Sequence, residues 1–493
     1  MRRARTGRRW LTDGGGGEGI AAGRGSSLLP AAPLPLHHSG GPRPVPRDGR
    51  PRARRRPRPR QPSDPMPRSL TPRLSVMMFL QFFIWGAWYT TIAVYMTNQG
   101  METLTHWPFT VNPIAAAVAP FFVGLVADRF FATQKVLGAL HILGGLVLLV
   151  VPHTASDPTL FILLLLLYNL FYMPTLALSS SLAFANIQDQ ERQFPKIRVW
   201  GTIGWIVAGL FISFGLRGLV EGGLPERTAL PLYSAAVASL LLGAYSFALP
   251  HTPPSAAGQV VSARTVLGID ALRQLGSRSF YVFIASALLI CIPLAAYYNF
   301  TQLYLEAARV SNIAATQTLG QMSEMIFMLA MPLLFARLGV KRMLLVGMAA
   351  WVVRYALFAW AAPGAVFWMI ALGILLHGIC YDFFFVTGQI YMDKKATPAI
   401  RAQAQGFFVF VTYGVGMLIG AQVAGNVYNR FLGGATTLTL EQWRQFWWIP
   451  AAFAAVVMVF FALAFHDRVG DTVVSPARMP RRTPAVTGGS PPP

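Results

Sequence analysis

Long apolar stretches recur between residues 75 and 465 of this chain, and no other feature constrains its fold as strongly. Each stretch is close to the roughly 20 residues that a helix needs to cross the hydrocarbon core of a bilayer. Inside a bilayer every backbone polar group must be bonded within the protein, and a helix meets that demand. The sequence therefore predicts an all-α integral membrane protein with twelve transmembrane helices. The predicted spans are residues 75–97, 108–127, 135–152, 159–182, 199–217, 229–249, 280–303, 313–336, 343–361, 365–391, 402–428 and 446–465.

Composition agrees with a polytopic membrane protein. Of the 493 residues, 54% are hydrophobic and only 12% are charged. These values exclude an ordinary soluble globular protein and a disordered one. The two cysteines, Cys291 and Cys380, lie inside predicted spans and lack the spacing of a disulfide framework or a zinc site. The sequence also lacks a phosphate-binding loop and a catalytic triad, so we expect no enzyme activity and no cofactor.

The net charge of +22 is concentrated near the N-terminus. Residues 1–73 contain seventeen arginines and four acidic residues, and they are rich in Pro and Gly. Such a composition buries too little apolar surface to fold, so we expect a disordered tail there and a second one at residues 467–493. The arginines could contact anionic lipid or RNA. An over-extended translation start before Met66 or Met77 is the alternative that we favour, and we expect no nucleic-acid partner.

The distribution of basic residues predicts how the spans are oriented. Lys and Arg gather in alternate loops, and the positive-inside rule therefore places both termini in the cytoplasm. The polar segment 251–279 then becomes a cytoplasmic linker between two six-helix halves, residues 74–250 and 280–466. The basic segments are residues 129–135, 192–198, 264–278, 337–342 and 394–401.

A short basic turn occurs at equivalent positions of the two halves. Gly124, Asp128 and Arg129 lie between spans 2 and 3, and residues 335–342 lie between spans 8 and 9. Duplicated turns of this kind indicate a transporter built from two pseudo-symmetric bundles with a site between them. Asp128 and Arg129 would then help to gate transport, although the same pair could serve only to cap helices and fix topology.

One carboxylate lies in the middle of an apolar run. Glu324 is the only formal charge between Ile313 and Phe335, and a charge at that depth is costly unless it is paired, protonated or next to a wet cavity. Gln317 and Gln321 precede it at helical spacing, so the three polar side chains share one face. We therefore predict a solute carrier with a hydrated cavity beside this helix.

Other spans carry polar and aromatic residues that a lipid anchor would not need. At helical spacing they form further stripes, which we expect to line the same cavity. Aromatic residues near span ends are more often interfacial, and buried amides often join helices, so both alternatives stay open. The polar and aromatic residues are Gln81, Trp85, Trp88 and Tyr89 in span 1, Tyr168, Asn169 and Tyr172 in span 4, Arg198, Thr202 and Trp205 in span 5, Tyr297, Tyr298, Asn299 and Gln302 in span 7, and His377, Tyr381 and Asp382 in span 10.

Two acidic residues in different spans suggest proton coupling. Asp382 lies in span 10 and Glu324 in span 8, while Arg354 in span 9 is the expected counter-ion for one of them. The proton affinity of a carboxylate depends on its burial and on nearby cations, so helix movement relative to Arg354 would load or release a proton. A static network of ion pairs is the alternative.

Six sequence strings carry a resemblance to a known family. They resemble the nucleoside:proton symporter family, the bacterial nucleoside permeases of the major facilitator superfamily. The likeness covers every predicted span in order, from residue 74 to residue 468. The strings are residues 79–88, 194–205, 323–327, 351–358, 381–384 and 398–406.

The resemblance implies a twelve-helix major facilitator fold with two pseudo-symmetric six-helix bundles. It also implies import of nucleosides with protons across the inner (cytoplasmic) membrane. Arg198, Thr202 and Trp205 match the family's substrate stripe in span 5, Gln321 and Glu324 match its nucleoside-binding pair in span 8, and Tyr381 and Asp382 match its acidic motif in span 10. Tyr298 and His377 stand where the family pattern has other residues.

We therefore hypothesise a proton-coupled importer of nucleosides that works by alternating access as a monomer in the lipid bilayer. One alternative is a symporter of the same type for another small polar solute, such as a sugar or a modified nucleoside. A second alternative is a membrane receptor or scaffold that transports nothing. The expected substrate contacts are Arg198, Thr202, Trp205, Tyr298, Gln302, Gln321, Glu324, His377 and Tyr381.

Overall fold

The computed structural model describes residues 70–122, 130–254, 275–397 and 400–466. Every regular element in these ranges is helical. The α-helices are α1 Leu70–Tyr89, α2 Ile92–Asn98, α3 Pro108–Phe122, α5 Thr133–Val150, α6 Pro158–Asn186, α7 Gln190–Leu210, α8 Leu230–Ser246, α11 Arg278–Ala307, α12 Ile313–Ala361, α13 Phe367–Leu375, α14 His377–Tyr381, α15 Thr387–Lys395, α16 Arg401–Val409, α17 Met417–Leu432 and α18 Leu440–Ala464. Three short π-helical segments continue or interrupt them, namely η4 Phe211–Gly215, η8 Asp382–Val386 and η9 Phe410–Gly416.

Nine helical segments among the described residues are long and apolar enough to cross a membrane. The prediction of an all-α membrane protein is therefore confirmed. Helix α12 covers two of the predicted spans, and its backbone breaks between them at Gly339, where φ is 66°. Glycine adopts this left-handed conformation without a steric penalty, so the turn falls on the residue best able to make it. Helix α1 begins at Leu70, within the last residues of the predicted N-terminal tail.

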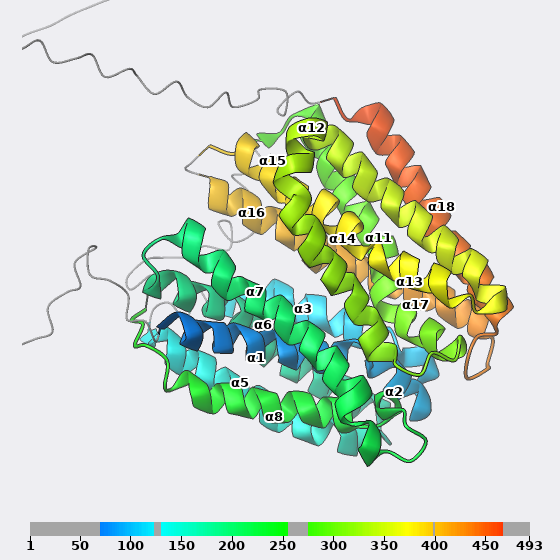
Figure 1. Ribbon diagram of the computed structural model, residues 1–493, viewed down its shortest axis with the longest axis horizontal. Helices are drawn as coiled ribbons and strands as arrows, with labels where there is room; N and C mark the ends of the chain where they lie inside the picture. Colours follow the sequence, from blue (N-terminus) through cyan, green and yellow to red (C-terminus); the bar gives the residue numbers. More distant parts are fainter. Residues whose placement is uncertain (1–69, 123–129, 255–274, 398–399, 467–493) are drawn as a thin grey trace, which may run out of the picture. The chain divides into compact units, whose positions relative to one another are not determined.

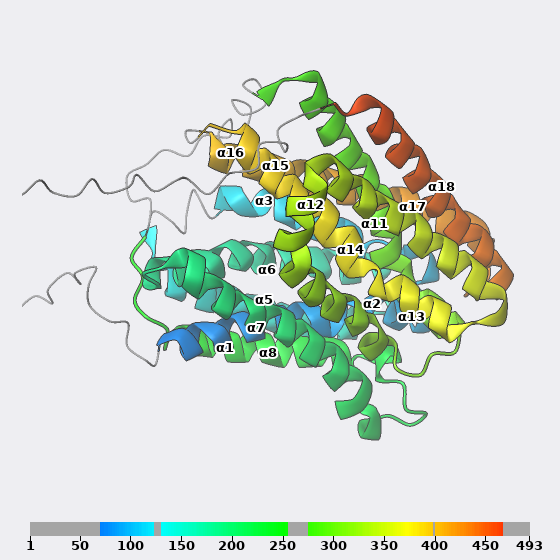
Figure 2. The same cartoon turned by 45° about the horizontal axis from the view of Figure 1, so that its top comes forward.

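The helices fall into two groups by their contacts. In the first helix group, α1 packs against α7 and α8, and α5 packs against α6 and α8. In the second helix group, α12 packs against α13, α14 and α18, and α11 packs against α17 and α18. Figures 1 and 2 show the first group in blue to green and the second in green, through yellow, to red. The groups meet where α7 contacts α12, α3 contacts α17 and α2 contacts α11.

Local sequence explains where several helices begin. Asp157 caps α6 by accepting hydrogen bonds from the backbone nitrogens of Thr159 (3.0 Å) and Leu160 (3.1 Å). Helix α18 starts with a capping box, in which the hydroxyl of Thr439 and the side chain of Gln442 each bond the other's backbone nitrogen. These caps satisfy the first amide groups of the helices, which have no partner inside the helix.

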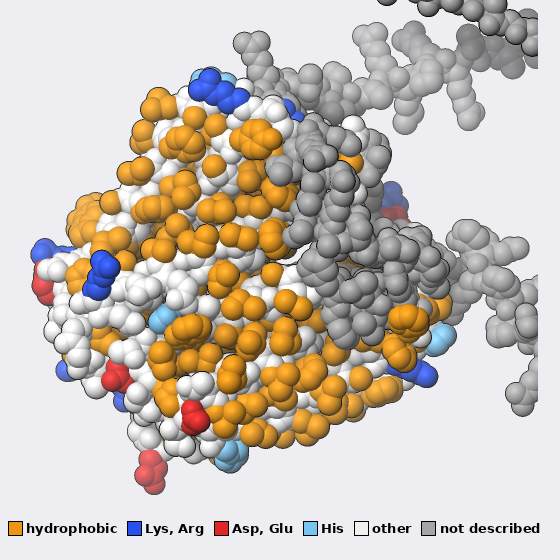
Figure 3. Space-filling view, turned by 180° about the vertical axis from the view of Figure 1, so that it is seen from behind, with side chains coloured by type: hydrophobic (Ala, Val, Ile, Leu, Met, Phe, Trp, Pro, Cys, Tyr) orange, Lys and Arg blue, Asp and Glu red, His pale blue; other side chains and the backbone are white. Residues whose placement is uncertain are grey.

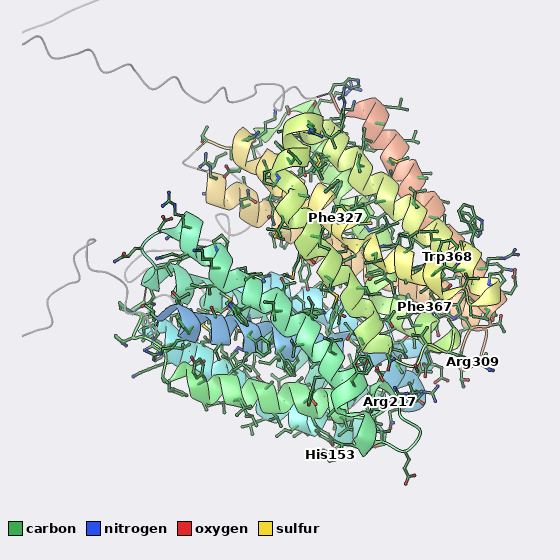
Figure 4. The ribbon with its side chains drawn as sticks, viewed as in Figure 1. His153, Arg217, Arg309, Phe327, Phe367 and Trp368 are labelled. Atoms are coloured by element: carbon green, nitrogen blue, oxygen red, sulfur yellow. The ribbon has the colours of Figure 1, made fainter. Side chains whose placement is uncertain are left out.

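The outer surface has the character expected of a protein in lipid. Figure 3 shows hydrophobic side chains over most of one face, with charged side chains mainly near its edges. Leu329 is 84% exposed and Leu333 is 62% exposed on α12, which would be unfavourable in water. Phe367 and Trp368, labelled in Figure 4, are also exposed at the start of α13. Aromatic residues at helix ends are typical of the membrane–water interface.

Candidate functional site

A cavity of about 240 Å³ lies between the two helix groups. Helices α1 and α7 of the first group line one side, and α11, α12, α14 and η9 of the second group line the other. The cavity brings together eight of the residues that the sequence nominated. They are Arg198, Thr202, Trp205, Tyr298, Gln321, Glu324, His377 and Tyr381.

Other nominated residues lie elsewhere. Gln302, Arg354 and Asp382 are buried but do not line the cavity. The predicted gating turn, with Gly124, Asp128 and Arg129, lies outside the described residues.

The stripe on α7 reaches the cavity because α7 packs very closely against α1. A β-carbon on Gly204 would lie 2.2 Å from the backbone oxygen of Phe79, so only glycine fits there. Small residues allow this close approach of two membrane helices. Arg198 and Trp205 are seven residues apart and share one face of α7, and the Arg198 guanidinium lies 4.1 Å from the ring centre of Phe82. That contact places a cation at the cavity wall.

Glu324 faces this cation from the opposite helix group. Its side chain is half-buried on α12, and Arg198 is the cation that acts on it electrostatically. The ion pairs among the described residues do not include one between Arg198 and Glu324. A positive charge on one helix group therefore faces a carboxylate on the other across the cavity.

Aromatic rings form much of the cavity wall. Trp85 is at their centre, with ring centroids 5.4 Å from Trp205, 5.7 Å from Tyr89 and 6.3 Å from Tyr413. Most of these contacts are edge-to-face, which is the favoured geometry for aromatic pairs. The stripe of span 1 indicated Trp85 and Tyr89, whereas no pattern in the sequence singled out Tyr413. A flat ligand would find several ring faces here.

His377 lines the cavity and stacks on the ring of Tyr297. Its imidazole lies 5.3 Å from the ring of Tyr297 at an interplanar angle of 19°, and the Tyr298 hydroxyl is 3.5 Å from its Nε2. The Arg354 guanidinium lies 4.1 Å from the centre of the Tyr297 ring, and its Nε donates to the Gly373 oxygen (3.0 Å). Arg354 thus supports the cavity wall from behind, and the described residues include no ion pair between it and a carboxylate.

Asp382 is buried next to the cavity in the π-helical segment η8. Within the described residues neither of its carboxylate oxygens has a hydrogen-bond partner, and Glu324 acts on it electrostatically. A buried, unpaired carboxylate at membrane depth is costly and is usually retained for function. π-Helical segments are also frequent at functional sites.

Hydrogen bonds between the helix groups gather near the ends of α1 and α11 and the start of α12. Gln302 accepts a hydrogen bond from the Ala93 nitrogen (2.9 Å), and Gln317 donates to the Thr90 oxygen (2.9 Å). These bonds join α11 and α12 to the first helix group. They explain why Gln302, although polar and in register with Tyr298, does not face the cavity.

Further contacts between the helix groups are made by α3 and the preceding loop. The Tyr413 hydroxyl donates to Asn112 (2.9 Å), and Gln422 donates to the Thr110 hydroxyl (2.8 Å). His106 packs against Gly425, where a β-carbon would lie 2.3 Å from the imidazole. Burial lowers the pKa of His106 to about 4, so this side chain is neutral near pH 7. We call these contacts, together with the hydrogen bonds of Gln302 and Gln317, the seal.

This chain is similar in sequence and in fold to known proteins. Residues 68–469 match the family model described as Nucleoside H+ symporter. The chain is 38% identical to the putative nucleoside transporter YegT of Escherichia coli K12, over 85% of this chain and 99% of that protein. It is 30% identical to the nucleoside permease NupG of the same organism, over 80% of this chain and 97% of that protein. The crystal structure of NupG aligns with a TM-score of 0.72 at 28% identity, covering 81% of this chain and all of that one.

Proposed function

This chain belongs to the nucleoside H+ symporter family, which has the major facilitator fold, and we propose that it imports nucleosides together with protons. The observation that carries the proposal is the cavity between the helix groups, where Arg198 on one group faces Glu324 on the other. A polar ligand bound there contacts both groups at once. Its binding can therefore be linked to their relative movement.

Nucleoside chemistry fits the residues that line the cavity. A ribose diol can donate hydrogen bonds to the Glu324 carboxylate and exchange them with the Gln321 amide. A flat base can stack on Trp85 or Trp205, which is worth about 1 to 3 kcal/mol for base–aromatic contacts. Arg198, Thr202, Tyr298, His377 and Tyr381 supply further polar groups around such a ligand. Gln302 contributes indirectly, because it helps to hold the seal.

Glu324 and Asp382 are the proton carriers in this proposal. Both lie at membrane depth, and they interact electrostatically with each other. Glu324 is the one in the cavity, so its proton and the substrate can depend on each other. Arg354 contributes a fixed positive charge behind the Tyr297 ring. Gating by Gly124, Asp128 and Arg129 remains part of the proposal on sequence grounds.

The proposal also includes the finer architecture. Counting α12 as two spans and adding the shorter helices α3 and α8 to the nine long segments gives twelve spans. The first helix group would then be a six-helix bundle over residues 74–250 and the second another over 280–466. A cytoplasmic linker at 251–279 and tails at 1–73 and 467–493 complete this arrangement. Both termini would be cytoplasmic in an inner membrane, and the transporter would be a monomer.

Uptake of labelled uridine and adenosine by cells that express this chain tests the function. We expect accumulation above the external concentration, and we expect a protonophore to abolish that accumulation because the proton gradient drives it. Uptake that resists the protonophore would contradict proton coupling, and absent uptake would favour another solute. A chain without residues 1–65 should transport normally, whereas a receptor that acts through its tail would lose function.

A further inference from the structure

A hydrogen-bond network lies behind the cavity wall, inside the first helix group. It joins Gln81 on α1, His141 on α5, Thr175 on α6 and Ser239 on α8, each no more than 1% exposed. None of these four residues lines the cavity. Polar side chains at this depth are unfavourable unless they are bonded, and each of the four has a partner.

The directions of the hydrogen bonds among Thr175, Gln81 and His141 follow from one backbone acceptor. The Thr175 hydroxyl donates its single proton to the Tyr172 oxygen (2.5 Å), so toward Gln81 it can only accept. The Gln81 nitrogen therefore donates to Thr175 (2.7 Å), and its Oε1 faces His141. Nε2 of His141, 2.9 Å from that oxygen, must carry the hydrogen. The Ser239 hydroxyl donates to the backbone oxygen of His141 (2.8 Å), and its Oγ also lies 3.2 Å from Nδ1 of the imidazole.

Tyr172 connects this network to the cavity. Its hydroxyl donates to the backbone oxygen of Gln81 (2.6 Å). Its ring makes edge contacts with His141 on one side, at 6.0 Å between centroids, and with Trp85 on the other, at 5.9 Å. Trp85 follows Gln81 by about one helical turn on α1 and lines the cavity. The network therefore supports the indole from behind through both its own helix and its ring neighbour.

Tyr172, which is bonded to the network, is one of the ring neighbours that hold Trp85. Nε1 of Trp85 has no hydrogen-bond partner among the described residues, so packing alone sets the position of the indole. We infer that Gln81 and His141 are positioning residues, which hold Trp85 where a flat ligand stacks in the cavity. The inference rests on the proposed function in so far as that ligand is a nucleoside base.

The kinetic test uses His141→Leu and Gln81→Leu, which remove the central hydrogen bond. We expect KM for nucleoside uptake to rise about tenfold while Vmax stays within about twofold, because part of a stacking contact is lost but the proton carriers are unchanged. His141→Gln keeps an N–H that can reach Oε1 of Gln81, so it should restore much of the affinity. Ser246→Ala is the matched control, since this buried serine on α8 bonds only its own helix at the Leu242 oxygen.

A spectroscopic test does not depend on nucleoside transport. In protein labelled with 5-fluorotryptophan, the ¹⁹F resonance of Trp85 is assigned by its loss in Trp85→Phe. We expect that resonance to shift or broaden in His141→Leu and to stay unchanged in Ser246→Ala. An unchanged resonance together with an unchanged KM would overturn the inference.

The two readouts separate this inference from the proposed function. If the wild-type chain transports no nucleoside, the proposed function fails, and the Trp85 resonance still decides whether the network positions the indole. If His141→Leu is not recovered in the membrane, Thr175→Val carries the same test. It keeps the side-chain volume and removes the acceptor for Gln81.

Discussion

In the proposed function, both substrate binding and proton coupling depend on Glu324. It is half-buried on α12, lines the cavity, and interacts with Arg198 from the other helix group and with Asp382 behind it. A carboxylate in this place can bind a ribose hydroxyl, and it can also exchange a proton. The amide of glutamine keeps the shape and hydrogen-bonding capacity but cannot titrate.

Glu324→Gln should therefore separate insertion from accumulation. We expect normal amounts of the variant in the membrane, because an amide is easier to insert than a carboxylate. Accumulation driven by an imposed pH gradient should fall to equilibrium with the medium. Uptake of labelled nucleoside into vesicles measures this accumulation. Glu441→Gln is the control, because Glu441 is exposed on α18 and pairs with Arg444. Gradient-driven accumulation at the wild-type level in Glu324→Gln would reject the role.

Helical spacing in the sequence predicted which residues line the cavity better than it predicted how the residues behind the cavity wall pack. Arg198, Gln321 and Glu324 were found because helical periodicity puts polar residues of one face together. The neighbours of Arg354 could not be predicted in this way, because the position of a long side chain depends on which helices pack around it. The structure places Arg354 on the Tyr297 ring, and an ion pair was the sequence expectation.

Helix α7 carries three cavity residues, so its distance from α1 determines where they lie. Gly204 permits the closest contact between these helices, since a β-carbon there would lie 2.2 Å from the Phe79 oxygen. Hydropathy predicted the helices themselves, and a loop was expected near Gly339, where α12 breaks. Hydropathy could not predict the π-helical segments η4, η8 and η9, because the same apolar residues suit α- and π-helical hydrogen bonding.

Gly204→Ala should push α7 away from α1. We expect a destabilisation of about 1 to 3 kcal/mol, the usual range for overpacking, together with weaker substrate binding. Thermal unfolding of the purified protein in detergent, with and without nucleoside, measures both effects. Gly406→Ala on α16 is the control, since nothing lies within 4 Å of its β-carbon and alanine favours a helix. Equal melting temperatures for the two variants would contradict the packing argument.

At the scale of the whole molecule, the proposed alternating access requires the seal to open once in each transport cycle. The seal joins the helix groups through hydrogen bonds such as the one from Gln422 on α17 to Thr110 on α3 (2.8 Å). A cavity that opens alternately to the two sides of the membrane requires these groups to separate there. The bonds are individually weak, in the range of about 0.5 to 1.5 kcal/mol each, so ligand binding can shift the balance between the closed and open states.

A covalent link across the seal should therefore stop transport. We expect Thr110→Cys with Gln422→Cys, joined by a short bifunctional thiol reagent, to lose uptake and to recover it when a cleavable linker is reduced. The native Cys291, which lines the cavity, and Cys380 are replaced by alanine in both pairs, so that only the introduced thiols can react. The control pair is Gln134→Cys with His251→Cys, whose native side chains are 3.0 Å apart within the first helix group. Linking that pair should leave uptake intact, because those two positions move together as the helix groups separate, whereas continued transport with the seal linked would exclude its opening as a step of the cycle.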